Sequence, residues 1–280
     1  MNIKQIKQKT AEAAGNFLRD LREAVVNNDT APDRTGDISA KSGMILLLAA
    51  GVYALVSRLL VMYFEPQVSR DAVYYLELVE QWSKSSFVET TKTDPYYFVP
   101  PFMIYCIQLP VRFGCPILPA AVGLNMLMNL SLVPLTYFAA LLLFRRRKLS
   151  VIAAFLIASH PRLVEMAPDV MRENFMLAGI LWCMIFALLG FYKNKYFFML
   201  TGFFAAVSAM VRYESLEILG ILGIIWLVML FNKVSFLKIL VQGLLFLAGF
   251  AAGMMILSML MGIPADFYSQ MAIYISRRAL

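Results

Sequence analysis

Histidine, cysteine and charged residues are scarce in this sequence, and their scarcity excludes several kinds of site. The 280 residues include one histidine and three cysteines, and charged residues make up 15% of the total. One histidine excludes a histidine-rich metal site. Cys106, Cys115 and Cys183 lie in or beside apolar segments and show neither metal-ligand spacing nor a paired framework, so we interpret them as packing residues. No metal or other cofactor is predicted from these residues.

Apolar residues dominate the chain instead. They make up 60% of it, and the mean hydropathy is +0.70. A soluble domain of this length could not bury so much apolar surface, whereas a bilayer covers apolar runs of roughly 20 residues each. The sequence therefore predicts an all-α polytopic membrane protein. Eight apolar runs are candidate membrane segments: 43–64, 99–114, 117–144, 149–160, 173–192, 196–211, 214–231 and 238–262.

The distribution of charge indicates which of these runs cross the membrane. Residues 99–114 are short and contain Pro100-Pro101 at their start, which suits a juxtamembrane helix. If this run stays outside the bilayer, 15 of the 25 basic residues and only 6 of the 18 acidic residues fall on one side. If it crossed, residues 145–148 (RRRK) would lie outside, against the positive-inside rule. We therefore predict seven transmembrane helices with a cytoplasmic amino terminus.

This topology divides the chain into three parts. Residues 1–42 form a cytoplasmic arm, which fits either a helix on the membrane surface or a solvated helix followed by a flexible linker at 27–41. Residues 43–262 form the transmembrane module, whose first outer loop, 65–116, contains juxtamembrane helices. Residues 263–280 form an outer tail. The net charge of +7 is attributed to loops that face anionic lipid, and no nucleic-acid partner is predicted.

The outer loop contains SRDAVYYLELVEQW (69–82), an acid-rich helical pattern. One face of this helix is predicted to carry apolar and aromatic side chains together with a carboxylate: Asp71, Tyr74, Tyr75, Leu78 and Trp82. Tyr and Trp suit the membrane interface because each has an apolar body and a polar tip. An anchor helix explains the rings but not Asp71, whose carboxylate either caps the helix start or accepts a proton from a hydroxyl group in catalysis.

Further charges are predicted at the same depth, near the outer ends of the spans: Arg58, Arg172, Glu173, Arg212, Glu214 and Glu217. A charge within a span costs roughly 3 kcal/mol, so it usually has a pairing or functional reason. Salt bridges, such as one between Arg212 and Glu217, and snorkelling at helix ends explain these charges structurally. The functional interpretation is a pocket for an anionic lipid headgroup, because the guanidinium fork matches phosphate oxygens.

The order of these features resembles the GT-C superfamily of membrane glycosyltransferases, which includes protein O-mannosyltransferases and aminoarabinose transferases. SRDAVYYL stands where that family has an acidic motif after its first span, and VPPFMIYCIQLPVRFG (99–114) resembles its Pro-Pro juxtamembrane helix. Later turns and a glycine-rich span of the family are matched by FRRRK (144–148), HPRLVEMAPDVMREN (160–174) and GFFAAVSAMVRYESL (202–216). The resemblance covers residues 43–262, and the family core also has seven spans.

The resemblance implies transfer of a sugar, with inversion, from a polyprenyl-phosphate donor to an acceptor glycan, lipid or protein at the outer face of a bacterial inner membrane. Asp71 would be the general base. The substrate-binding residues would be Arg58, Tyr74, Tyr75, Arg172, Glu173, Arg212 and Glu214. Among these, Arg172 and Arg212 would hold the lipid phosphate, the tyrosines would contact the sugar and the glutamates would orient the arginines.

The sequence departs from the family at two places. Ala72 follows Asp71 where many relatives have Asp-Glu, so a divalent metal is not favoured. Relatives continue beyond the position of Leu280, so we expect a truncated product, a minimal core or one part of a split enzyme with a partner subunit. The main alternative is a non-catalytic accessory or lipid-binding protein with a degenerate or truncated GT-C fold. A transporter would need polar residues near the midplane of its spans, which are mostly apolar here.

Overall fold

The computed structural model describes residues 36–64, 68–84, 100–231 and 234–263, and within these ranges its regular structure is entirely helical. The elements are α2 (Ala40–Phe64), α3 (Arg70–Lys84), α5 (Phe102–Arg112), α6 (Ile117–Phe144), α7 (Arg147–Ser159), α8 (Pro161–Glu165), α9 (Arg172–Tyr192), α10 (Phe197–Ala209), η2 (Tyr213–Leu216), α11 (Glu217–Phe231) and α12 (Phe236–Met261). The predicted arm before residue 36 and the predicted tail after residue 263 lie outside the described residues.

Five helical segments are long and apolar enough to cross a membrane: α2, α6, α9, η2 with α11, and α12. The chain is therefore a multi-pass helical membrane protein. The runs predicted at 149–160 and 196–211 form α7 and α10, which have 13 residues each. Such a helix is about 20 Å long, compared with roughly 30 Å for the hydrocarbon core of a bilayer. Seven spans therefore remain a prediction, whereas α5, with 11 residues, is as short as predicted.

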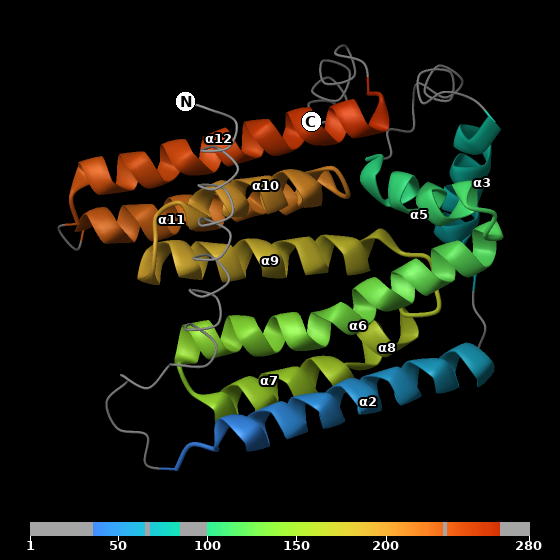
Figure 1. The fold of residues 1–280 in the computed structure, drawn as a ribbon, viewed down its shortest axis with the longest axis horizontal. Coiled ribbons are helices and arrows are strands. Elements are labelled where there is room, and N and C mark those ends of the chain that lie inside the picture. The colour runs from blue at the N-terminus through green and yellow to red at the C-terminus, as the bar shows by residue number, and fades with distance from the viewer. Residues whose placement is uncertain (1–35, 65–67, 85–99, 232–233, 264–280) are drawn as a thin grey trace, which may run out of the picture.

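The long helices lie side by side and alternate in direction (Figure 1). The start of α2, the α6–α7 and α9–α10 connections, the end of α11 and the start of α12 lie at one end of the bundle. We call it the basic end because it carries residues 145–148 (RRRK), Lys193 and Lys195. The opposite end carries α3, α5 and the starts of α6, α9 and η2, and we call it the α3/α5 end. The loops that charge assigned to the cytoplasm thus lie together.

At the basic end, a residue of the predicted linker is held against α7. The backbone N–H groups of Lys148 and Arg147 donate to the Asp37 carboxylate at 2.9 and 3.1 Å. Burial alone would raise the pKa of Asp37, but these N–H groups and that of Ile38 outweigh it and lower the pKa. Asp37 therefore stabilises the start of α7, where free N–H groups favour an anion.

Helices α10 and α12 approach most closely at glycines. A Cβ atom on Gly249 would lie 1.9 Å from the carbonyl oxygen of Met199, and a Cβ on Gly202 would lie 2.0 Å from that of Phe246. Gly253 follows Gly249 at the four-residue spacing that lets membrane helices pack backbone to backbone. Side chains larger than hydrogen at these positions would force the two helices apart.

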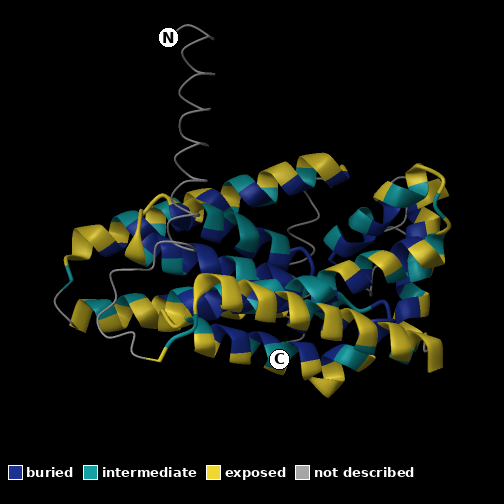
Figure 2. Ribbon diagram, turned by 60° about the horizontal axis from the view of Figure 1, so that its bottom comes forward, coloured by how far each residue is buried: buried dark blue, intermediate teal, exposed yellow. Residues whose placement is uncertain are grey.

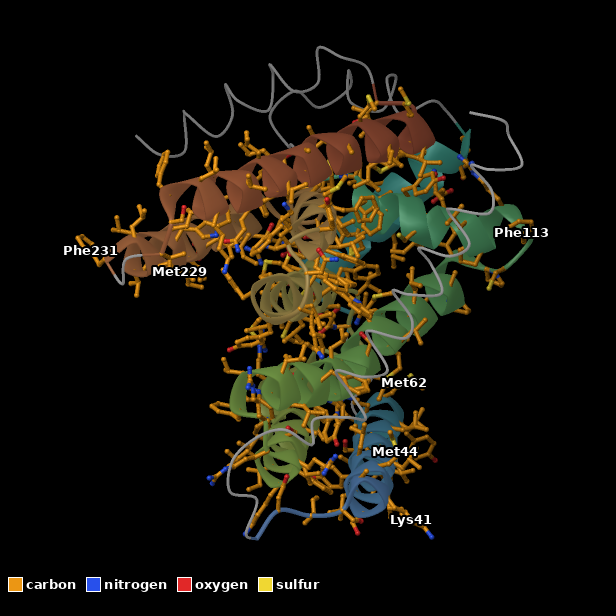
Figure 3. All side chains as sticks on the ribbon, turned by 60° about the vertical axis from the view of Figure 1, so that its left-hand side comes forward. Lys41, Met44, Met62, Phe113, Met229 and Phe231 are labelled. Atoms are coloured by element: carbon orange, nitrogen blue, oxygen red, sulfur yellow. The ribbon has the colours of Figure 1, made fainter. Side chains whose placement is uncertain are left out.

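Apolar side chains cover much of the outer surface, as expected for lipid contact. Exposed residues follow one side of α2 and most of α11 (Figure 2). Met44 and Met62 on α2, and Phe231 at the end of α11, point away from the bundle (Figure 3). The buried side of α2 is a narrow stripe of small or apolar residues that ends in the buried Arg58.

At the α3/α5 end, α3 packs through Ala72, Tyr75, Val79 and Trp82 against α5 and the ends of α6, α9 and α12. The start of α5 is tied to the end of α10 by the N–H of Phe102, which donates to the carbonyl of Met210 at 3.0 Å. The five residues predicted to share one face of this helix at the membrane interface differ in burial. Tyr75 and Trp82 are buried, whereas Asp71 is exposed.

Candidate functional site

Most of the predicted polar residues, but not Arg58, converge where α3, the start of α9 and the turn between α10 and η2 meet (Figure 1). Arg172 and Glu173 are the first two residues of α9, and Arg212 directly precedes η2. Tyr75 lies in the second turn of α3 and is 3% exposed. Segments about 100 residues apart in the sequence thus form one polar cluster, which we call the Arg172–Arg212 cluster.

Arg212 is the ion-paired centre of this cluster. Its guanidinium contacts the carboxylate of Glu173 and lies 3.1 Å from that of Glu214. The hydrogen bond to Glu214 raises the pKa of Arg212; burial opposes this rise, and the charges of both glutamates add to it. The pairing that the sequence suggested with Glu217 is replaced by these two closer partners. Two carboxylates therefore balance Arg212 before any ligand binds.

Arg172 has a different environment. Its Cζ atom lies 5.2 Å from the centre of the Tyr75 ring, which is a cation–π contact. Among the described residues Arg172 forms no ion pair with a carboxylate, and its buried Nε has no hydrogen-bond partner. It interacts with Glu214 through the electrostatic field rather than by direct contact. Arg172 is therefore the cation of the cluster with unused capacity to bind an anion.

The Tyr75 hydroxyl stays protonated at neutral pH. Burial is the main reason that its pKa is raised. The charge of Arg172 and a hydrogen bond with its side chain lower the pKa, whereas the carboxylates of Asp71 and Glu173 raise it further. The phenol can therefore donate a hydrogen bond. Tyr74 is half-buried beside it, with ring centres 6.1 Å apart.

Asp71 lies in the first turn of α3 but does not cap the helix. That role belongs to Ser69, whose hydroxyl accepts the N–H of Ala72 at 3.1 Å. Within the described part of the chain, the exposed Asp71 carboxylate forms no ion pair or hydrogen bond, and it acts on Tyr75 through its charge. The capping interpretation of Asp71 is therefore not needed, and its carboxylate is accessible.

Arg58 is not part of this cluster. It is 0% exposed, and its Nη1 donates to the carbonyl oxygens of Ala158 (2.8 Å) and Ala54 (3.1 Å), while its Nε donates to Asn129. Ala158 belongs to the last turn of α7, where the helix dipole favours a cation. Arg58 thus joins α2 to α6 and α7.

Sequence reasoning missed three buried asparagines beside Arg58: Asn125, Asn129 and Asn174. They hydrogen-bond to one another and to backbone carbonyls of residues 163–169. The sequence does contain a signal of this hydrogen-bond network, because Asn125 and Asn129 are four residues apart on an otherwise apolar span. The spacing puts both amides on one helix face, which predicts a polar partner in the bundle.

No group of three or more histidine, cysteine or carboxylate side chains that could hold a metal ion occurs among the described residues. Comparisons with protein-family models, curated proteins and solved structures find no match to this chain. The conclusion from sequence and structure together is a multi-pass helical membrane protein with a polar cluster at one end of its bundle.

Proposed function

We propose that this chain is a membrane glycosyltransferase, or the catalytic core of one, of the GT-C type. It would move a sugar, with inversion, from a polyprenyl-phosphate donor to an acceptor glycan, lipid or protein. One observation carries the proposal. A guanidinium with unused binding capacity, Arg172, packs on Tyr75 in the same two turns of α3 that hold the accessible Asp71.

The proposal includes seven crossings, with the basic end in the cytoplasm and the α3/α5 end at the outer face of a bacterial inner membrane. The alternating helix directions support it, because α7 and α10 then connect the same two ends as their longer neighbours. The clustering of the arginine and lysine turns at the basic end supports the orientation.

The chemistry follows from the positions of the charges. Asp71 takes the proton from an acceptor hydroxyl, whose oxygen forms a bond to the anomeric carbon of the sugar. The bond from that carbon to the phosphate oxygen breaks on the opposite face, and polyprenyl phosphate leaves with the electron pair. Arg172 stabilises the negative charge that grows on the phosphate. Glu173 and Glu214 hold Arg212 in ion pairs, so Arg212 is not free to bind the phosphate.

One observation favours the accessory, non-catalytic alternative. Arg212 is already balanced by two carboxylates, so this half of the cluster is complete as a structural ion-pair network. In that case the chain would bind lipid at the α3/α5 end without transferring sugar.

Three substitutions in the full chain in lipid nanodiscs separate these functions: Asp71→Asn, Arg172→Ala and, as a control, Arg162→Ala. Arg162 is a matched arginine at the same end, but it is exposed and pairs with Glu165 on its own short helix. Binding of undecaprenyl phosphate is measured by native mass spectrometry, and transfer is measured with undecaprenyl-phosphate-linked sugars as donors.

Arg172→Ala should weaken undecaprenyl phosphate binding about tenfold or more, because a charge-assisted hydrogen bond contributes about 1.5–3 kcal/mol. Asp71→Asn should abolish transfer and leave this binding unchanged, and Arg162→Ala should affect neither. Normal transfer by Asp71→Asn would refute the base assignment. Lipid binding without transfer by the unmodified chain would favour the accessory function.

A further inference from the structure

A buried loop lies behind the Arg172–Arg212 cluster. Residues 166–170 (MAPDV), which the sequence predicts as part of a polar outer loop, are all buried. Loops usually stay at the surface because their backbone N–H and C=O groups need partners. Here side chains from two spans supply those partners. The Nδ2 of Asn125 lies 3.0 and 2.9 Å from the carbonyl oxygens of Met166 and Ala167, and that of Asn174 lies 3.2 Å from Met166.

The asparagines that hold the loop are also bonded to each other. Asn174 donates to Asn125 at 3.0 Å, and Asn129 donates to Asn174 at 2.9 Å. Each of the three side chains is 0% exposed. A buried amide with all its partners satisfied has one favoured orientation, so the network holds α6, α9 and the loop in a fixed relation.

Asp169 extends this network to α3. Its backbone carbonyl accepts from Asn125, and its carboxylate accepts the backbone N–H of Ser69 at 3.1 Å. Ser69 in turn caps α3 through its hydroxyl, two residues before Asp71. Asn174 stands two residues after Arg172. A continuous path of hydrogen bonds therefore joins the helix that carries Asp71 and Tyr75 to the helix that carries Arg172.

We propose that Asp169 is a positioning residue, whose carboxylate holds the start of α3 and thereby sets Asp71 and Tyr75 against Arg172. The catalytic part of this inference rests on the proposed glycosyltransferase function. Asp169 is 7% exposed and contacts α3 through a backbone N–H, so it fixes the helix start whatever side chain stands at position 69. A displacement of the reacting groups by about 1 Å can lower a rate about a hundredfold.

Two variants of the full chain in nanodiscs test this role: Asp169→Ala, which removes the acceptor, and Asp169→Asn, which keeps an oxygen for the Ser69 N–H. Glu165→Ala is the matched control, because Glu165 is an acidic residue of the same segment whose side chain is 59% exposed. Hydrogen–deuterium exchange of residues 69–75 reports on the start of α3. Transfer kinetics and undecaprenyl phosphate binding report on the cluster.

Asp169→Ala should speed exchange of residues 69–75 about tenfold to a hundredfold, as expected for loss of a hydrogen bond to a charged group. It should lower kcat about tenfold or more and change the affinity for undecaprenyl phosphate less than about twofold. Asp169→Asn should restore most of the slow exchange of residues 69–75 and most of kcat. Glu165→Ala should match the unmodified chain.

Unchanged exchange in Asp169→Ala would overturn the positioning role, as would an Asp169→Asn variant as defective as Asp169→Ala. These results are separable from failure of the proposed function. If the unmodified chain transfers no sugar, the exchange measurement still shows whether Asp169 holds α3.

Discussion

Replacement of Gly249 by alanine tests the packing of α10 on α12, two helices whose backbones approach closely at glycines. The added Cβ would lie 1.9 Å from the Met199 carbonyl oxygen, whereas ordinary contact begins at 3.4 Å. The two backbones would therefore have to separate by about 1.5 Å, and overpacking of this kind costs about 1–3 kcal/mol or more.

Gly243 offers a control on the same helix, because a Cβ there would meet nothing within 4 Å. Alanine at either position gains the same helix propensity, about 1 kcal/mol relative to glycine. That gain cancels when the two variants are compared, so their difference isolates the clash. We expect Gly249→Ala to be less stable than Gly243→Ala by about 1–3 kcal/mol.

The free energy of unfolding can be measured by titrating sodium dodecyl sulfate into mixed micelles and following tryptophan fluorescence. Gly243→Ala should be as stable as the unmodified chain or more stable, and Gly249→Ala should unfold at a lower detergent fraction. Equal unfolding free energies for the two variants would show that α10 and α12 do not pack through Gly249.

Two further predictions concern buried or anchored polar groups. The lowered pKa of Asp37 means that its carboxylate stabilises the fold above the ordinary pKa of aspartate, 3.8, and that this stability is lost as the pH falls through the lower folded value. Unfolding titrations between about pH 6 and pH 3 should show this loss in the unmodified chain and not in Asp37→Asn. This variant keeps an oxygen acceptor but loses the charge, so it should be about 0.3–1 kcal/mol less stable near neutral pH. Asn129→Leu removes the acceptor of the buried Arg58 Nε and should cost about 3 kcal/mol in the same assay, because a buried charge loses a hydrogen bond. A cost below about 1 kcal/mol would show that Arg58 is not held by Asn129.

The boundaries of the long helices agree with the apolar runs because bilayer crossing depends on local properties. The run predicted at 117–144 is α6 to the residue, and the run at 173–192 differs from α9 by one residue. The α3 pattern predicted a helix correctly but not its buried face. Helical periodicity tells which side chains share a face, and the neighbours that cover the helix decide which face is buried.

The burial of the middle of segment 160–174 could not be predicted from the local sequence pattern for the same reason. Its residues are polar enough for a surface loop, and its burial depends on amides of Asn125 and Asn174 that lie on other helices. Charge spacing likewise placed Arg58 with the other outer arginines. The structure instead turns Arg58 inward to the end of α7, because the carbonyl of Ala158 is close there.

The length and apolarity of each run identified a multi-pass membrane protein and its main spans, and the positions of Arg and Lys predicted the grouping of its basic turns. These are local properties of the sequence, which do not depend on how the helices pack. The interaction partner of each charged side chain cannot be predicted from such local properties. Arg212 meets Glu173, Arg172 meets Tyr75 and Arg58 meets Asn129 because particular helices become neighbours. The contact of two side chains far apart in sequence depends on packing, and packing exists only once the bundle has formed.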